Sequence, residues 1–163
     1  MPGIRGPSQG SLNLEIRVDY GPYGSGFNQS IAAAAEATLQ DQDINSGSLT
    51  IVLTDEPGIR DYNRRYAGID RPTDVLSFTD GEIDPDTGAA YIGDVIICPP
   101  VALTGAENGR HALLNELSLL TVHGVLHLLR YDHHNEGSRD HMWRAQERIL
   151  RRLGSPTEEN GGR

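Results

Sequence analysis

Three histidines, His123, His127 and His133, follow the pattern H-x3-H-x5-H within an unusually apolar run. On an α-helix, His123 and His127 lie one turn apart on the same face, so that one rigid element can supply two nitrogens to a single metal ion. His133 would lie about 9 Å further along the axis if that helix simply continued. The motif therefore predicts a helix that ends near residues 129–131 and a chain that then folds back.

The segment 110–129 is apolar on nearly all sides of a helical projection, which is typical of a central, buried helix. Imidazoles are costly to bury on such a helix unless they are paired or coordinated. Imidazole ligands suit zinc, and three protein ligands leave a fourth position for water, as in catalytic zinc sites. We therefore expect one Zn2+ ion held by His123, His127, His133 and a water molecule.

Other polar side chains are not expected to bind the metal directly. Asp132 is a candidate to orient a ligand imidazole through its second nitrogen. His111 and His141 are interpreted as surface residues. Cys98, the single cysteine, is expected to be a buried residue at a strand end rather than a fourth ligand.

Apolar alternation and turn residues predict strands at 12–18, 49–54, 74–78 and 91–98. Helices are predicted from 28 or 30 to about 39, at 59–66, at 110–129 and at 137–153, with a short helical turn after Pro99-Pro100 and a hairpin-like excursion at 79–90. The order β-α-β-α-β-β-α-α, without regular alternation, indicates an α+β fold. We expect one mixed sheet of about four strands packed on helices around the central histidine-bearing helix.

The length of 163 residues fits one domain, at 12–153, between a flexible leader at 1–11 and a disordered tail at 154–163. One cysteine excludes an internal disulfide framework. The first eleven residues lack the apolar core of a signal peptide, and no apolar run reaches spanning length. The sequence therefore predicts a cytoplasmic protein without a membrane partner.

The net charge of −9 argues against broad, non-specific binding of nucleic acids. All fourteen basic residues are nevertheless arginines, several of them clustered at 60–71 and 139–152. These clusters are either solvated helix faces or a local patch that binds phosphate.

The same histidine spacing occurs in metzincin proteases, in which a glutamate directly after the first histidine is the general base. Here that position is Gly124, which has no acid-base group. Peptide hydrolysis by that mechanism would need a base from elsewhere.

Four stretches together resemble the YbeY family of bacterial metal-dependent endoribonucleases, also called rRNA maturation factors. They are Asn63-x-x-Tyr66-x-Gly68-x-Asp70-x-Pro72-Thr73-Asp74-Val75-Leu76-Ser77-Phe78, Gly93-Asp94-Val95-Ile96-Ile97, the segment from His123 to His133, and Met142-x4-Glu147-x-Ile149-Leu150. The resemblance spans roughly 12–153. It implies a zincin-like α+β fold, zinc held by the three histidines, and cleavage of single-stranded RNA. It also implies a role in 16S rRNA 3′-end maturation and ribosome quality control, with the ribosome or its small subunit as partner.

The chain departs from the family pattern at two positions. The family's usual arginine, thought to contact RNA phosphate near the metal, is Ala67, and its usual glycine at the helix end is Arg130. One hypothesis is that Arg130 supplies the cation missing at Ala67; independent drift is the alternative. Arg64, Arg65 and Arg71 are competing candidates for RNA binding.

Arg130 and Asp132 are the only candidates for catalytic side chains, and no general base is identified. Attack on the phosphodiester by a metal-bound hydroxide and attack by the RNA's own 2′-OH both remain open. Two other functions compete with the endoribonuclease: a zinc hydrolase of peptides or amides, and a non-catalytic ribosome-assembly factor with a structural metal.

Overall fold

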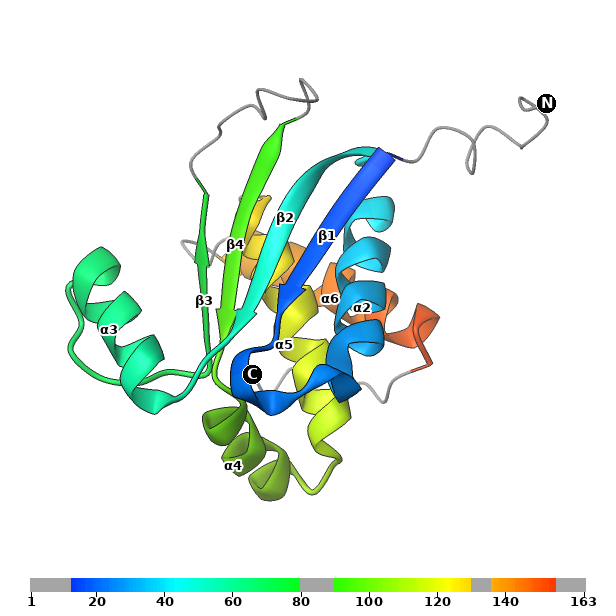
Figure 1. Cartoon of the computed structure of the whole chain (residues 1–163). Helices are drawn as coiled ribbons and strands as arrows, with labels where there is room; N and C mark the ends of the chain where they lie inside the picture. The colour runs from blue at the N-terminus through cyan, green and yellow to red at the C-terminus, as the bar shows by residue number, and fades with distance from the viewer. Residues whose placement is uncertain (1–12, 80–89, 130–135, 155–163) are drawn as a thin grey trace.

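A mixed sheet of four strands, in the order β1-β2-β4-β3, lies at the centre of the molecule (Figure 1). The computed structural model describes residues 13–79, 90–129 and 136–154. Strands β1, β2 and β4 are mutually parallel, and the short strand β3 pairs antiparallel with β4 at one edge. The strands are β1 (Asn13–Asp19), β2 (Ser46–Leu53), β3 (Val75–Phe78) and β4 (Tyr91–Ile97).

Five α-helices and two 3-10 helices accompany the sheet in the described ranges. They are η2 (Gly21–Tyr23), η3 (Ser25–Phe27), α2 (Asn28–Asp41), α3 (Glu56–Ala67), α4 (Pro99–Gly109), α5 (Leu113–Leu128) and α6 (Glu136–Arg152). The predicted α+β class, with a mixed four-stranded sheet, is confirmed. The predicted leader, the excursion after Thr79 and nearly all of the predicted tail fall outside the described residues.

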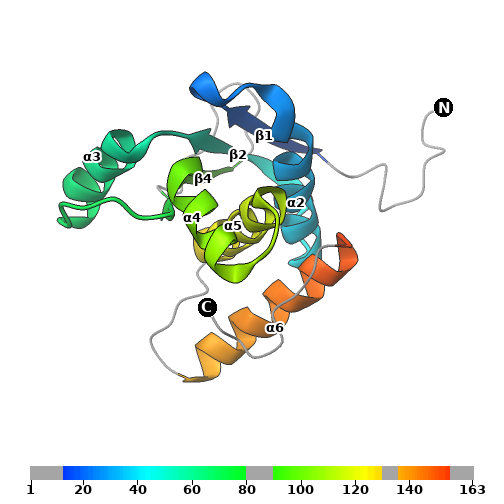
Figure 2. The ribbon, with the colours of Figure 1, turned by 90° about the horizontal axis from the view of Figure 1, so that it is seen from below.

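The helices cover the sheet in layers (Figure 2). Helices α2 and α5 pack side by side on one face of the sheet, and α6 packs against both of them on the side away from the strands. The shared core is made of buried aliphatic side chains from all three layers, which is why the apolar residues of α5 extend around its circumference. They include Ile31 and Leu39 of α2, Ile51 of β2, Val95 of β4, Leu117 and Val125 of α5, and Met142 and Ile149 of α6.

Helix α4 is longer than the short turn that the sequence predicts. Pro99 and Pro100 occupy its first two positions, where a missing N–H costs nothing because those donors have no partner within the helix. The helix ends at Arg110, whose φ of 60° and ψ of 42° are left-handed. The proline pair that follows the strand is therefore also the start of a helix of three turns.

Helix α3 lies beyond the β3 edge of the sheet (Figures 1 and 2). Asp55 caps its N-terminus, since its side chain accepts a 2.8 Å hydrogen bond from the backbone N–H of Gly58. Gly68 ends the helix in the left-handed conformation that glycine adopts at little cost. Within the described ranges, no helix combines the length and the apolar character needed to cross a bilayer.

Candidate metal centre

The side chains of His123 and His127 converge on one point at the side of α5. Their Nε2 atoms are 3.1 Å apart, and the two rings meet edge to face with centroids 4.6 Å apart. Both side chains are half-buried, although the residues around them on α5 are almost all buried. The i, i+4 spacing thus brings two imidazole nitrogens together at the surface of an otherwise buried helix.

This separation fits a shared metal ion. Two nitrogens that each lie 2.0–2.1 Å from one tetrahedral zinc ion are about 3.3 Å apart. His133, the third predicted ligand, lies outside the described residues, and within those residues no group of three His, Cys, Asp or Glu side chains gathers. The described part of the site therefore supplies two of the three predicted nitrogens.

Gln146 of α6 orients the first imidazole. Its side-chain Oε1 lies 3.1 Å from Nδ1 of His123, and the glutamine is only 4% exposed. An amide oxygen can only accept, so Nδ1 carries the proton and Nε2 keeps its lone pair towards His127. This is the arrangement by which metal-binding histidines are commonly held, with the second nitrogen donating to a fixed oxygen.

Sequence reasoning missed Gln146, although a signal was present. On α6, Met142 and Ile149 face the core, and Gln146 lies four residues after the first and three before the second. It therefore occupies the apolar stripe of an amphipathic helix. A polar residue in such a stripe needs a buried hydrogen-bond partner, and His123 provides it.

Gly124 allows α5 to pack closely against the sheet. A Cβ at this position would lie 2.6 Å from Cγ1 of Val95, whose side chain is fully buried, and 3.3 Å from Oγ of Ser77. The position that holds the general-base glutamate in metzincins is thus filled by the sheet. The structure gives a steric reason for the glycine and leaves no space there for a carboxylate.

A cleft of about 300 Å³ lies beside the two imidazoles, between β3 and α5. It is lined by Val75, Leu76, Ser77, Thr79, His123, His127 and Leu128. Gly93 of β4 has a φ of 150° and allows β3 and α5 to pack closely beside the cleft. A Cβ at this position would lie 2.4 Å from the carbonyl oxygen of Phe78 and 2.7 Å from the side chain of Leu128. The cleft therefore has two hydroxyl groups, apolar walls and the histidine pair.

Helix α5 ends directly after the second histidine, as the three-histidine spacing requires. Its last residue is Leu128, and Leu129 leaves the helix with φ of −90° and ψ of 16°. The helix thus ends one residue before the predicted range of 129–131, and the predicted return of the chain lies outside the described residues. Arg130 and Asp132, the candidate catalytic residues, lie beyond the described end of this segment together with His133.

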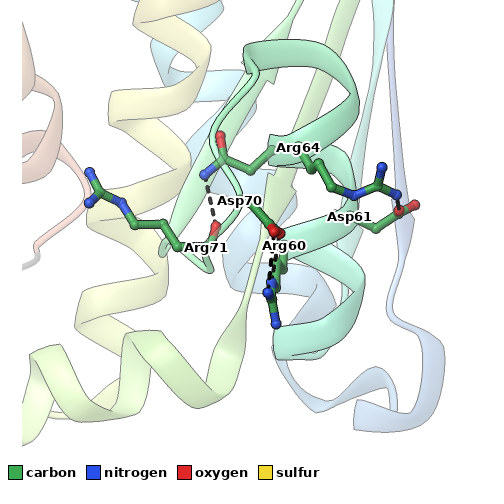
Figure 3. Close-up of polar contacts among 6 residues, drawn as sticks. Arg60, Asp61, Arg64, Asp70 and Arg71 are labelled. Atoms are coloured by element: carbon green, nitrogen blue, oxygen red, sulfur yellow. Dashed lines mark hydrogen bonds and ion pairs between the residues drawn. The ribbon is translucent and has the colours of Figure 1, made fainter.

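The three predicted RNA-binding arginines differ in their surroundings. Arg64 pairs with Asp61 through one carboxylate oxygen, and Arg65 pairs through the other, with Nε 3.0 Å from Oδ2 (Figure 3 shows the first pair). Arg71 forms no ion pair with any described residue, and its exposed side chain extends away from that of Arg64 (Figure 3). Of the three, Arg71 is the one whose charge is not balanced by a carboxylate in the described part of the chain.

The loop that carries Arg71 is folded back onto α3. The buried side chain of Asn63 donates a 2.9 Å hydrogen bond to the backbone carbonyl of Arg71, which Figure 3 labels. Asp70 accepts hydrogen bonds of 2.8 and 3.3 Å from the Arg60 guanidinium, which holds the pKa of that carboxyl below its ordinary value. These contacts tie the loop after α3 back to the helix.

Cys98 and His111 are both predicted to lie outside the metal site, and the structure gives their surroundings. Cys98 is fully buried, and burial raises the pKa of its thiol, which disfavours the thiolate that a metal would bind. His111, predicted to be a surface residue, is instead half-buried, and its Nε2 lies 2.7 Å from Oε1 of the buried Glu116. His111 therefore lies between α4 and α5, where it contacts the carboxylate of Glu116, a charged residue in the apolar helix α5.

Comparison with known proteins places this chain in a family. The family model described as Endoribonuclease YbeY matches residues 15–154. An endoribonuclease YbeY from Corynebacterium kroppenstedtii is 35% identical over 159 residues, which cover 92% of this chain and 78% of the relative. One from Acidothermus cellulolyticus is 42% identical over 125 residues, 65% of this chain and 76% of the relative.

A solved structure shows the same fold. The solution structure of a Thermotoga maritima protein superposes with a TM-score of 0.57 at 24% identity, over 91% of this chain and 99% of the other. The sequence match covers both the histidine helix and the glycines that fix its approach to the sheet. The chain belongs to the YbeY family of endoribonucleases.

Proposed function

We propose that this chain is a zinc-dependent endoribonuclease that cleaves single-stranded RNA in the cleft between β3 and α5. In this proposal the fold is zincin-like, and α5 is the central helix whose His123 and His127, together with His133, hold the ion. The observation that carries the proposal is the pair of Nε2 atoms 3.1 Å apart at the side of a cleft, the first of them held by a buried glutamine. Membership of the YbeY family supports RNA as the substrate.

The chain's own residues prepare the site in three ways. Gln146 fixes the tautomer of His123, Gly124 sets the depth at which α5 lies on the sheet, and apolar side chains line one side of the cleft. When bound by these imidazoles, Zn2+ supplies a Lewis acid and lowers the pKa of a coordinated water to about 7.

The histidines are the only titratable side chains among the described residues that line the cleft. The hydroxyl of Ser77 donates to the carbonyl of Gly124 at 2.8 Å, and that of Thr79 donates to the carbonyl of Ile92 at 2.7 Å. Neither hydroxyl is therefore arranged as a nucleophile with a neighbouring base. Arg130 and Asp132 remain predicted catalytic residues, because the described lining offers no other acid or base.

The proposed cellular substrate is the 3′ end of 16S rRNA, on or near the small ribosomal subunit. This part of the proposal rests on the family, whose members are named as endoribonucleases. Peptide hydrolysis by the metzincin mechanism is disfavoured, because Val95 occupies the space that a base after His123 would need.

The test compares His127→Ala with His141→Ala, an exposed histidine of α6. We expect the His127 variant to lose bound zinc and cleavage of a fluorescent single-stranded RNA while its circular dichroism spectrum is retained. The His141 variant keeps both. Retained cleavage in the folded, zinc-free His127 variant would overturn the proposal, and zinc binding without any cleavage by the wild type would instead favour an assembly factor with a structural metal.

The product ends separate the two routes of attack. Attack by the RNA's 2′-OH breaks the P–O5′ bond, leaves a 2′,3′-cyclic phosphate and releases a 5′-OH. Attack by water or hydroxide adds an oxygen to phosphorus and leaves one phosphate monoester and one hydroxyl end. Mass spectrometry of the two product fragments distinguishes these outcomes.

A further inference from the structure

Three aromatic side chains form a continuous surface beyond the edge strand of the sheet. Tyr62 and Tyr66 extend from α3, and Phe78 ends β3. The Tyr66 and Phe78 ring centroids are 5.1 Å apart, and Tyr62 lies 6.3 Å from each of the other two rings. We call these three side chains the aromatic platform.

Tyr66 is the exposed member of the platform. It is 61% exposed, which makes it the most exposed large hydrophobic side chain in the described ranges, whereas Tyr62 and Phe78 are half-buried. Tyr62 and Phe78 also contact the buried residues Ile59, Ile96 and Cys98 from the side. The platform is thus anchored at its base, and it presents one tyrosine ring to the outside.

Hydrogen bonds hold the backbone on both sides of Tyr66. Asp55 caps the first turn of α3, and the loop after the helix is tied back by the hydrogen bond from Asn63 to the carbonyl of Arg71. A ring held in this way loses little conformational freedom when a flat ligand stacks on it.

A guanidinium group accompanies the rings. The Cζ atom of Arg65 lies 5.3 Å from the centroid of Tyr66 and 5.9 Å from that of Tyr62. Aromatic faces beside an arginine are the combination that binds single-stranded nucleic acid, since bases stack on the rings and the cation attracts the backbone. Asp61, which pairs with Arg65, reduces this charge but leaves the ring faces unchanged.

Strand β3 connects the platform to the histidine cleft. Ser77 and Thr79 line the cleft, and Phe78 between them belongs to the platform. Successive side chains of a strand point to opposite faces, so the two sites are separated by the thickness of this one strand. Because β3 is an edge strand of the sheet, an RNA chain that leaves the cleft can pass over the edge and reach Tyr66.

We propose that Tyr66, supported by Tyr62 and Phe78, stacks on an unpaired nucleobase of the RNA strand whose phosphodiester lies in the histidine cleft. The inference rests on the proposed endoribonuclease function for its ligand, and it adds a base-binding subsite on the far side of β3. It assigns to Tyr66 a contribution to substrate binding and none to the chemical step.

The test compares Tyr66→Ala and Tyr66→Trp with Tyr20→Ala, a 37% exposed tyrosine outside the platform. The probe is a fluorescent single-stranded RNA of roughly twelve nucleotides, a length that a strand-tracking site can hold. Its affinity is measured by polarisation in EDTA, and kcat and KM are measured with the zinc-loaded enzyme.

We expect Tyr66→Ala to bind between about fivefold and a hundredfold more weakly, which is the range for one lost base stack. KM rises by the same factor and kcat at saturating RNA is unchanged, whereas Tyr66→Trp restores affinity because it retains a ring. An affinity of Tyr66→Ala within about twofold of the Tyr20→Ala control would overturn the inference. That result would mean that the aromatic platform does not bind RNA.

A second measurement locates the stacked base. The RNA is made abasic at one position at a time, and each oligonucleotide is titrated with wild-type protein and Tyr66→Ala. One abasic position should weaken wild-type binding and have no further effect on the variant, since both changes remove the same contact. Additive losses at every position would contradict the proposal.

These outcomes are independent of the proposed metal chemistry. If Tyr66→Ala binds RNA normally while His127→Ala abolishes cleavage, the platform is wrong and the proposed function stands. If Tyr66→Ala loses RNA affinity while His127→Ala still cleaves, the proposed metal site is wrong and the platform stands.

Discussion

The hydroxyl of Ser77 donates a 2.8 Å hydrogen bond to the backbone carbonyl of Gly124, across a separation of 47 residues in the chain. This bond joins the edge strand β3 to helix α5 at the residue that follows His123. The same glycine contacts Val95 of β4, so that one turn of α5 is held by two strands at once. The cleft beside the histidines is therefore bounded by two elements whose spacing is set at a single backbone position.

Gly124→Ala should destabilise the protein in spite of the better helix propensity of alanine. The exchange gains up to about 1 kcal/mol within a helix. The new Cβ would lie 2.6 Å from the fully buried Cγ1 of Val95, and overpacking of this kind costs about 1–3 kcal/mol. We expect a net loss of up to about 2 kcal/mol in the free energy of unfolding, measured by urea denaturation.

Two further variants provide the control for this exchange. Gly26→Ala adds a methyl group at a position with no heavy atom within 4 Å and should leave the stability within about 0.5 kcal/mol of the wild type. Val95→Ala combined with Gly124→Ala should lose less stability than the sum of the single variants, because the clash is then relieved. Strict additivity would show that the contact is not the cause.

Gln146→Leu should weaken zinc binding by about tenfold to a hundredfold, the usual effect of removing the partner of a metal-binding histidine. The leucine has a similar volume but cannot accept the hydrogen bond from Nδ1 of His123. Gln146→Glu retains an oxygen at this position and should bind zinc at least as tightly as the wild type. Competition with a chromophoric chelator measures both affinities, and an unchanged affinity of the leucine variant would exclude the orienting role.

The ion pair between Asp41 of α2 and Arg148 of α6 should make stability depend on acid pH. Arg148 donates from Nε to Oδ1 at 2.7 Å and from Nη2 to Oδ2 at 2.6 Å, and these bonds lower the pKa of Asp41 in the folded protein. The unfolded chain, with a pKa of about 3.9, therefore takes up a proton first as the pH falls. The stabilisation is complete above about pH 5 and is lost as the pH falls through the unfolded pKa towards the lower, folded pKa.

The size of this effect is modest because the Arg148 side chain is 57% exposed. We expect about 1 kcal/mol or less, measured as the difference in unfolding free energy between pH 6 and pH 3 for the wild type and Asp41→Asn. The variant should show a shallower decline over that interval. An identical decline in both proteins would assign the acid sensitivity to other carboxylates.

Arg71→Ala should weaken RNA binding more than Arg64→Ala. Arg71 has no ion-pair partner among the described residues, whereas the charge of Arg64 is compensated by Asp61. If Arg71 contacts one phosphate, its removal lowers the slope of log affinity against log salt concentration by about 0.7 for a single-stranded RNA. Equal salt slopes for the wild type and the Arg71 variant would exclude that contact.

The elements of this fold could be predicted from local patterns, whereas their arrangement could not. Apolar runs, alternation, caps and turn residues placed all four strands and α2, α5 and α6, each to within a few residues of the observed bounds. The sheet order, with β4 between β2 and the antiparallel β3, depends on contacts between distant segments. The same limit applies to Gln146, which follows His123 by 23 residues and shows its role only once α6 has packed against α5.

The helix break is the part of the site that the sequence specified best. A third histidine six residues after His127 cannot reach the same ion from a continuous helix, so the metal hypothesis itself required an end near residue 129. The structure ends α5 at Leu128. The ion pairs of the arginines at 60–71 could not be inferred in the same way. Asp61 and Asp70 are close in sequence to each of these arginines, and only the fold determines which pairs form.

The hydrogen bond between His123 and Gln146 also has a consequence for synthesis. The two residues are made 23 positions apart, about 1–5 seconds at ordinary rates of translation. During that interval the nascent chain carries both imidazoles of α5 without the amide that selects the tautomer of the first. The two histidines of the proposed metal site are thus made before the glutamine that selects the tautomer of His123. The orientation of His123 is therefore complete only after α6 has been made and has packed against α5.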